Sequence, residues 1–309
     1  MTKPILLSIG GGKGGIGKTL IASRLAYSLG NAGYRVVVAD LDFGAANLHS
    51  WLGAAHPKDS LHDFLRGKVT HLRDLLTETS FPRVSFLAGG QEFWQQIRPE
   101  SLEKIRLINA FQNLPCDYVI LDLGAGTHIT TLDFFIYSHK GIVIVVPEPT
   151  SIENAYVFMK SIFYRKVQTI GKVLHQEKQM ESLLQKLSDV NVRVSYLQQV
   201  QSFSRTYPDL GHNLLASLEA TDMGIIVNQV RNTEDKNLGS SMAMISRKYF
   251  GLNSSLMGTI SHDPQLWQVL RQSELPPLLA TIDSEVDALL GHIIPQIPKG
   301  VPSYVNDTP

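Results

Sequence analysis

The chain has 309 residues, and its 28 Lys and Arg balance its 28 Asp and Glu, so the formal net charge is zero. This balance excludes strong global attraction to nucleic acid or to an anionic membrane. With 43% hydrophobic and 18% charged residues the chain is not intrinsically disordered, and its length is sufficient for one large α/β domain.

Cysteine content and hydropathy indicate the compartment. Cys116 is the single cysteine, which excludes a disulfide framework and fits a reducing cytosol. No apolar stretch approaches the length that spans a bilayer, and the first residues lack the pattern of a signal peptide. We therefore expect a cytoplasmic protein.

Apolar runs bounded by turn or charged residues recur along the chain, with helical patterns between most of them. They cover residues 5–9, 35–39, 84–88, 118–121, 142–146, 224–227 and 256–260. Near-continuous Val and Ile runs that alternate with helices are typical of a parallel sheet covered on both faces. The sequence therefore predicts an α/β fold with a mostly parallel central sheet, whose ligands bind beyond the carboxyl ends of the strands.

The first run leads into a glycine-rich loop and then an amphipathic helical pattern. The loop matches G-x-x-x-x-G-K-[ST], whose backbone N–H groups bind phosphate while Lys18 neutralises charge and Thr19 ligates Mg²⁺. A plain glycine turn is the alternative, but the strand before and the helix after disfavour it. We expect the phosphates to be bound by Gly12, Lys13, Gly14, Gly15, Ile16, Gly17, Lys18, Thr19 and Leu20.

Carboxylates follow two further predicted strands. Asp40 and Asp42 are two residues apart at a strand end, so both side chains point toward the ligand crevice. Asp122 ends another strand and can hold Mg²⁺ through water, while Gly124 and Gly126 allow close backbone approach. A solvated turn or a buried strand with a glycine turn would be the plain alternatives, but three such motifs in this order disfavour them.

The string Lys-Gly-Gly-Ile-Gly-Lys-Thr resembles the deviant Walker A loop of the MinD/ParA superfamily of P-loop ATPases, among which MinD and FlhG-like members look most similar. The resemblance implies the deviant-Walker P-loop NTPase fold. It also implies that Lys13, the additional lysine, reaches across a dimer interface to the partner's ATP, so that nucleotide binding favours a homodimer. A solvated lysine beside the phosphates is the alternative.

The same resemblance implies roles for the carboxylates. Asp42 would orient or polarise the attacking water, so Lys18, Asp42 and Lys13 form the implied catalytic set. Asp40 would support the hydration shell of Mg²⁺, which Thr19 and Asp122 would hold. By the same resemblance Asn47 shapes the γ-phosphate site, and the backbone at Gly124 senses that phosphate.

The nucleotide base is less strongly encoded. The segment after the 224–227 strand resembles the family segment that reads adenine, which makes Asn228 and Arg231 candidates, and an Asn-Lys-x-Asp guanine motif is absent from the sequence. ATP is therefore the expected nucleotide. Ser261 stands where relatives often have proline. In the resembling segment at 146–156, Ser151 can cap a helix and Glu148 is placed near the dimer interface.

One interval is too long for a simple crossover between strands. Its apolar residues keep roughly helical spacing, which predicts a helical insertion over about 163–221 within a single ATPase domain spanning 1–294. The apolar stripe either packs on its own domain or docks an unidentified protein partner. Residues 295–309 are rich in proline and polar residues, and we expect a loose tail.

We therefore expect an ATP-dependent, dimerising switch with slow, partner-stimulated hydrolysis that positions a structure such as the division site, flagellum or chromosome. An ATP-binding scaffold with little hydrolysis, or a metabolic P-loop enzyme, remains open. A metal-handling or electron-transfer ATPase is disfavoured because such proteins need paired cysteines.

Membrane and DNA binding have little support in the sequence. The last predicted helix, 284–294, carries acidic residues and no Lys or Arg, so it should bind anionic lipid poorly and pack in the core instead. DNA binding needs a basic patch. The candidates are Arg98, Lys104 and Arg106 near one helix, for which a solvated face is the favoured interpretation, and Arg165, Lys166 and Lys172 near the insertion.

Overall fold

A central eight-stranded sheet organises the computed structural model, which describes residues 3–42, 47–90, 102–188, 195–266 and 279–294. The strand order is β3-β4-β2-β5-β1-β6-β7-β8, and every pair is parallel except β3 with β4. The strands are β1 (Ile5–Gly10), β2 (Val36–Leu41), β3 (Thr77–Glu78), β4 (Val84–Leu87), β5 (Tyr118–Leu123), β6 (Lys140–Val145), β7 (Met223–Val230) and β8 (Ser254–Ser261). Each predicted strand is confirmed. The sequence pattern missed only β3, which is two residues long.

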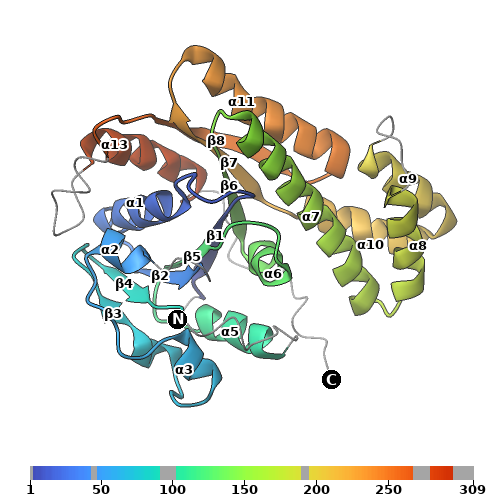
Figure 1. Ribbon diagram of the computed structural model, residues 1–309. Coiled ribbons are helices and arrows are strands. Elements are labelled where there is room, and N and C mark those ends of the chain that lie inside the picture. Colours follow the sequence, from blue (N-terminus) through green and yellow to red (C-terminus); the bar gives the residue numbers. More distant parts are fainter. Residues whose placement is uncertain (1–2, 43–46, 91–101, 189–194, 267–278, 295–309) are drawn as a thin grey trace.

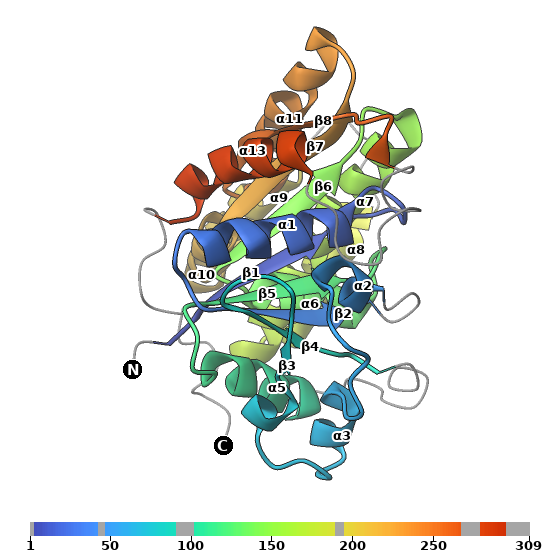
Figure 2. The same ribbon diagram turned by 90° about the vertical axis from the view of Figure 1, so that its left-hand side faces the viewer.

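Helices cover both faces of the sheet, as the near-continuous apolar strands predict (Figures 1 and 2). One face carries α1 and α13, and the opposite face carries α5, α6 and α7. Among the described residues, no helix is both long and apolar enough to cross a lipid bilayer. The helices are α1 (Lys18–Asn31), α2 (Leu48–Leu52), α3 (Leu61–Leu65), α5 (Leu102–Gln112), α6 (Ile129–Tyr137), α7 (Pro149–Val173), α8 (Glu177–Ser188), α9 (Tyr196–Thr206), α10 (Pro208–Glu219), α11 (Thr233–Ile245) and α13 (Ala280–Leu289).

Helices fill the interval for which an insertion is predicted. The 25-residue α7 runs unbroken through position 163, and α8, α9 and α10 follow it at the side of the molecule before β7 returns to the sheet (Figure 1). Met180, Leu183, Val200 and Leu214 are buried in the same apolar cluster as α7. The apolar stripe therefore packs on its own domain in the described part of the interval.

The C-terminal helix begins earlier than the sequence pattern predicts. It starts at Ala280 rather than 284, and a short turn over 290–292 follows it. Ile282, Val286 and Leu289 are buried in the cluster that also contains the apolar face of α1. The helix is therefore part of the core, as its lack of basic residues predicts. The predicted tail, 295–309, lies outside the described residues.

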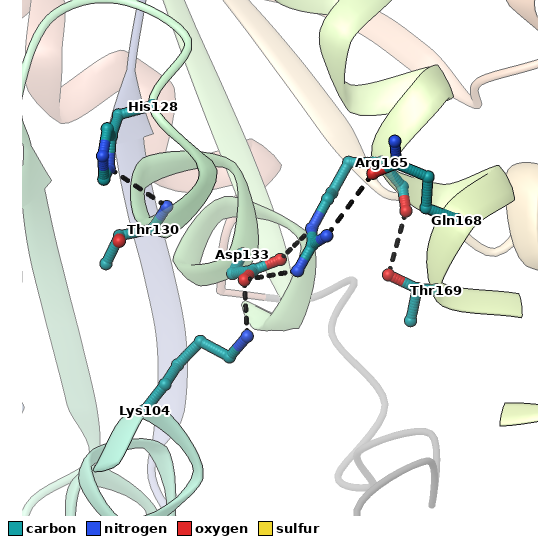
Figure 3. Close-up of polar contacts among 7 residues, drawn as sticks. All are labelled: Lys104, His128, Thr130, Asp133, Arg165, Gln168 and Thr169. Atoms are coloured by element: carbon teal, nitrogen blue, oxygen red, sulfur yellow. Dashed lines mark hydrogen bonds and ion pairs between the residues drawn. The ribbon is translucent and has the colours of Figure 1, made fainter. Parts of the chain in front are cut away.

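The predicted solvated face at Lys104 is wrong, because this lysine is buried against Asp133 of α6. Arg165 of α7 binds the same carboxylate through Nε at 2.6 Å and Nη2 at 2.9 Å, so one aspartate joins three helices (Figure 3). Lys166 is also buried, and its Nζ donates to the carbonyl oxygen of Ser217 at 2.7 Å.

These contacts reduce the support for a DNA-binding surface. Lys104, Arg165 and Lys166, half of the six candidate basic residues, are occupied by contacts within the protein. Arg106 also reaches inward, where its Nη1 donates to the carbonyl oxygen of Leu65 at 3.3 Å. Arg98 lies outside the described residues.

Candidate nucleotide-binding site

The glycine-rich loop connects the end of β1 to the start of α1. Gly17 adopts a left-handed backbone conformation with φ of 91° immediately before Lys18, the first residue of α1. A Cβ at Gly12 would come within 2.1 Å of the carbonyl oxygen of Asn154 on α7, so a side chain cannot fit there. Glycine is therefore required for the turn at one position and for close backbone approach at the other.

A cavity of about 640 Å³ opens over this loop. The predicted site residues that line it are Gly14, Gly15, Gly17, Lys18, Thr19, Leu20, Asp42, Asn47 and Asn228. Lys18 has only 6% of its surface exposed and lies at the N-terminus of α1, where the helix dipole favours an anion. The phosphate end of the cavity thus combines backbone N–H groups, a helix N-terminus and a buried ammonium.

Two buried carboxylates lie beside this end of the cavity. Asp40 on β2 and Asp122 on β5 are register partners in the sheet and are 2% and 1% exposed. Burial raises the pKa of each to about 7; the adjacent carboxylate of Asp40 adds to the effect on Asp122, and Thr19 and Lys18 oppose it. Apart from the neighbouring Thr19 hydroxyl, neither side-chain oxygen of Asp122 has a hydrogen-bond donor beside it among the described residues.

This donor set fits a magnesium ion. A buried carboxylate without a partner is costly unless a cation compensates it, and Asp122 lies next to the Thr19 hydroxyl. In the described ranges no group of three or more His, Cys, Asp and Glu residues could hold a metal by itself. Mg²⁺ in phosphate sites needs only one or two protein ligands, with water and phosphate oxygens supplying the others.

The three predicted motifs meet at the carboxyl end of the sheet. The Asp42 backbone N–H donates to Oδ1 of Asp40 at 3.0 Å. A Cβ at Gly124 would lie 3.3 Å from Oδ1 of Asp42, and the Gly126 N–H donates to the carbonyl oxygen of Gly11 at 3.2 Å. Glycine after β5 therefore lets Asp42 and the phosphate loop approach each other closely.

Lys13 is not among the described residues that line the cavity. Its Nζ contacts Glu148 Oε2 at 3.1 Å and Thr150 Oγ1 at 3.0 Å at the start of α7, and its side chain is 38% exposed. The expected capping by Ser151 is wrong, because Glu148 occupies the N-cap position of α7. The hydroxyl of Ser151 instead accepts a hydrogen bond from the N–H of Val146 at 3.1 Å.

Residues at the carboxyl ends of β7 and β8 also line the cavity. The buried amide of Asn228 donates to the carbonyl oxygen of Ile16 at 2.8 Å and accepts from the N–H of Gln229 at 2.9 Å. Asn228 therefore also braces the phosphate loop. Arg231 is exposed and is not among the cavity's described lining residues.

Ser261, the residue that stands where relatives often have proline, also lines the cavity. The lining residues that the sequence did not suggest are Trp51, Gln229, His262, Asp263, Pro264, Leu266 and Ile282. They come from α2, from the ends of β7 and β8, and from α13, and no local motif marks them. Gln229 alone has an unusual backbone, a left-handed conformation with φ of 59° after a register shift in β7.

Comparison with known families supports a nucleotide site. The model of the CobQ/CobB/MinD/ParA nucleotide-binding domain (CbiA) matches residues 7–276. The chain belongs to this family. The matched residues include the phosphate loop and both carboxylate motifs. A nucleotide-binding domain is also consistent with the cavity that opens over the loop.

Individual relatives within the family support the same assignment. The antiactivator FleN of Pseudomonas aeruginosa is 30% identical over 195 residues, which cover 61% of this chain and 68% of FleN. The flagellum site-determining protein YlxH of Helicobacter pylori is 35% identical over 158 residues, or 50% of this chain and 52% of YlxH. The match therefore spans about half of that relative's length.

Solved structures share the fold across nearly the whole chain. The septum site-determining protein MinD of Pyrococcus horikoshii, solved with Mg-ADP, superimposes with a TM-score of 0.62 at 19% identity, covering 94% of this chain and 96% of MinD. A ParA family ATPase from Chlorobium tepidum gives a TM-score of 0.60 at 14% identity and covers 93% and 98% of the two chains. The predicted MinD/ParA fold is thereby confirmed.

Proposed function

We propose that this protein is an ATPase switch: ATP and Mg²⁺ bind at the cavity, the ATP-bound form dimerises, and slow hydrolysis returns it to monomers. Family membership supports nucleotide binding, and Mg-ADP bound to the MinD of Pyrococcus horikoshii supports this nucleotide class. Dimerisation and hydrolysis rest on the arrangement of the residues themselves.

The phosphate loop would hold the triphosphate through backbone N–H groups, with Lys18 neutralising the β- and γ-phosphates. Thr19 would hold Mg²⁺ directly, and Asp40 and Asp122 would bind it through water. The ion would supply charge neutralisation between the phosphates. Asp42, which lines the cavity, would position the attacking water.

The position of Lys13 carries the dimer proposal. A second phosphate-loop lysine that served its own nucleotide would be expected to line its own cavity, yet Lys13 projects to Glu148 and Thr150 on the surface beside it. There it is accessible to a second copy of the chain. Exchanging these contacts for a partner's phosphates would make dimerisation depend on ATP, because ATP would bind the dimer more tightly than the monomer.

The proposed cellular role is to regulate the placement or activity of a structure such as the flagellum. The relatives named antiactivator and flagellum site-determining protein favour it over the division site or chromosome. The helical insertion is the candidate docking site for a protein partner. Its buried apolar stripe restricts such a partner to the outer surfaces of α8, α9 and α10.

Light scattering with and without nucleotide tests the switch. ATP with Mg²⁺ should shift the wild-type protein from monomer to dimer, whereas ADP should not. Lys13→Ala should still bind ATP but remain monomeric, because the contact to the partner's phosphates is removed. Asp42→Ala should bind ATP and dimerise but lose phosphate release, because the water is no longer positioned.

Two outcomes would contradict the proposal. A Lys13→Ala protein that dimerises normally with ATP excludes the trans role of this lysine. Unchanged phosphate release by Asp42→Ala excludes this carboxylate as the water-positioning group. Lys18→Ala is the control, since it should lose nucleotide binding altogether and therefore both dimerisation and phosphate release.

A further inference from the structure

Ser261, at the end of β8, makes an unusual pair of contacts with the C-terminal helix. Its backbone N–H donates to Glu285 Oε2 at 2.8 Å, and its hydroxyl donates to Glu285 Oε1 at 2.6 Å. Both carboxylate oxygens of one α13 side chain are therefore engaged by a single residue of β8. Charge-assisted hydrogen bonds of this kind are shorter and stronger than neutral ones.

The residue that Glu285 binds belongs to the wall of the cavity. Ser261, His262, Asp263 and Pro264, at the end of β8 and just after it, are among the residues that line the cavity. The N–H of His262 donates to the carbonyl oxygen of Val230 at 2.9 Å, which fixes this segment to β7 on one side. Because β8 is the last strand of the sheet, Glu285 supplies the support on its other side.

A second contact fixes α13 itself beside the cavity. Asp283 lies 3.6 Å from the guanidinium of Arg24 on α1, the helix that begins at the phosphate loop. Arg24 is 1% exposed, and Ile282 of α13 lines the cavity. The C-terminal helix α13 therefore contacts α1 as well as the end of β8, and these contacts fix the position of Glu285.

We infer that Glu285 is a positioning residue for nucleotide recognition: it holds the 261–264 segment in the shape that receives the base and ribose. The inference rests on the proposed ATP binding, in which the triphosphate occupies the loop end and leaves the base for this wall. A proline at position 261 would restrict the backbone through its ring. Ser261 has no such ring, and the contact with Glu285 restricts the backbone in its place.

Glu285→Ala should therefore weaken ATP binding by about tenfold, as expected when an ordered binding wall loses a charge-assisted contact. Binding of inorganic tripolyphosphate, which makes no base contact, should stay within about twofold of wild type. Isothermal titration calorimetry measures both ligands. Asp287→Ala is the matched control, since Asp287 is an exposed carboxylate on the same helix, and it should bind ATP as wild type does.

A rescue variant separates positioning from general stability. Glu285→Ala combined with Ser261→Pro should regain ATP affinity to within about twofold of wild type, because the proline ring restricts the backbone again. Proline is tolerated at this position because β8 is an edge strand, so that no hydrogen bond between strands is lost. Glu285→Gln should retain most affinity, because its amide can still accept from the Ser261 N–H. Thermal melts check that each variant is folded.

The outcomes distinguish this inference from the proposed function. If wild-type protein binds neither ATP nor tripolyphosphate, the nucleotide proposal itself fails. If wild type binds ATP and Glu285→Ala binds it equally well, the inference is overturned while the nucleotide proposal stands. An equal loss of ATP and tripolyphosphate affinity, or no rescue by proline in a folded double variant, also overturns the positioning role.

Discussion

Asp122 and Asp133 are equally buried aspartates with opposite surroundings. Each is 1% exposed. Asp133 receives Lys104 and Arg165 on its two oxygens (Figure 3), whereas among the described residues Asp122 forms no ion pair and has only the Thr19 hydroxyl beside it as a donor. Burial alone therefore does not show whether a carboxylate has a structural role, but its partners do.

The difference has a physical consequence. A buried ion pair stabilises only if both partners remain, since loss of one leaves an uncompensated charge in a medium of low dielectric constant. Asp133 has both of its cationic partners and therefore stabilises the contact between α5, α6 and α7. Asp122 has no ion pair of this kind: Thr19 and Lys18 only partly offset its burial, and the proposed Mg²⁺ would offset more of it.

The same substitution at both positions should give effects of opposite sign. We expect the larger one from Asp133→Asn, which should lower the free energy of unfolding by about 3 to 5 kcal/mol because buried Lys104 and partly buried Arg165 lose their counter-charge. Urea denaturation of nucleotide-free protein measures it. The control is Asp117→Asn at the exposed Arg35–Asp117 pair. If Asp133→Asn lowers the free energy of unfolding no more than Asp117→Asn does, the structural role of Asp133 is contradicted.

Asp122→Asn should raise the free energy of unfolding of nucleotide-free protein by about 3 kcal/mol at pH 8, because the buried charge disappears. The same variant should lose the Mg²⁺ dependence of ATP binding. Urea denaturation and calorimetry with and without Mg²⁺ test both statements. A destabilised Asp122→Asn protein would mean that this carboxylate has a structural partner like that of Asp133.

Lys166 extends the comparison to a buried cation. Burial lowers its pKa to about 8, and its Nζ donates to a neutral carbonyl, that of Ser217. The unfolded chain then binds more protons than the native state above about pH 8, so stability should rise with pH. The expected rise is about 2 kcal/mol between about pH 8 and about pH 10. It should be absent in Lys166→Met, and an equal rise in that variant would contradict the assignment.

Much of the site was predictable from local sequence. The phosphate loop, Asp40, Asp42 and Asp122 each follow a strand that its apolar run identifies, and a parallel sheet brings the carboxyl ends of these strands together. The remaining wall of the cavity, where we propose that the base binds, was not predictable in this way. Trp51, Leu266 and Ile282 reach the cavity from three separate elements, and none lies in a recognisable motif.

The sequence also did not show which charged residues are paired with each other. Lys104 and Arg165 look like basic surface residues in the sequence, because a charge pattern gives the type of side chain but not its partner. Their shared partner Asp133 lies 29 and 32 residues away in the chain, and helix packing on one face of the sheet brings them together.

The sequence by itself determined the parallel sheet, the phosphate loop and the carboxylates at the strand ends. These features depend on residue spacing within one strand, turn or helix start, where the backbone geometry is nearly the same in every protein. Only the tertiary structure decided which charges are paired and which distant side chains line the cavity, and it alone shows the contact between Ser261 and Glu285 across 24 residues. Such contacts depend on how distant elements pack, which no local pattern specifies.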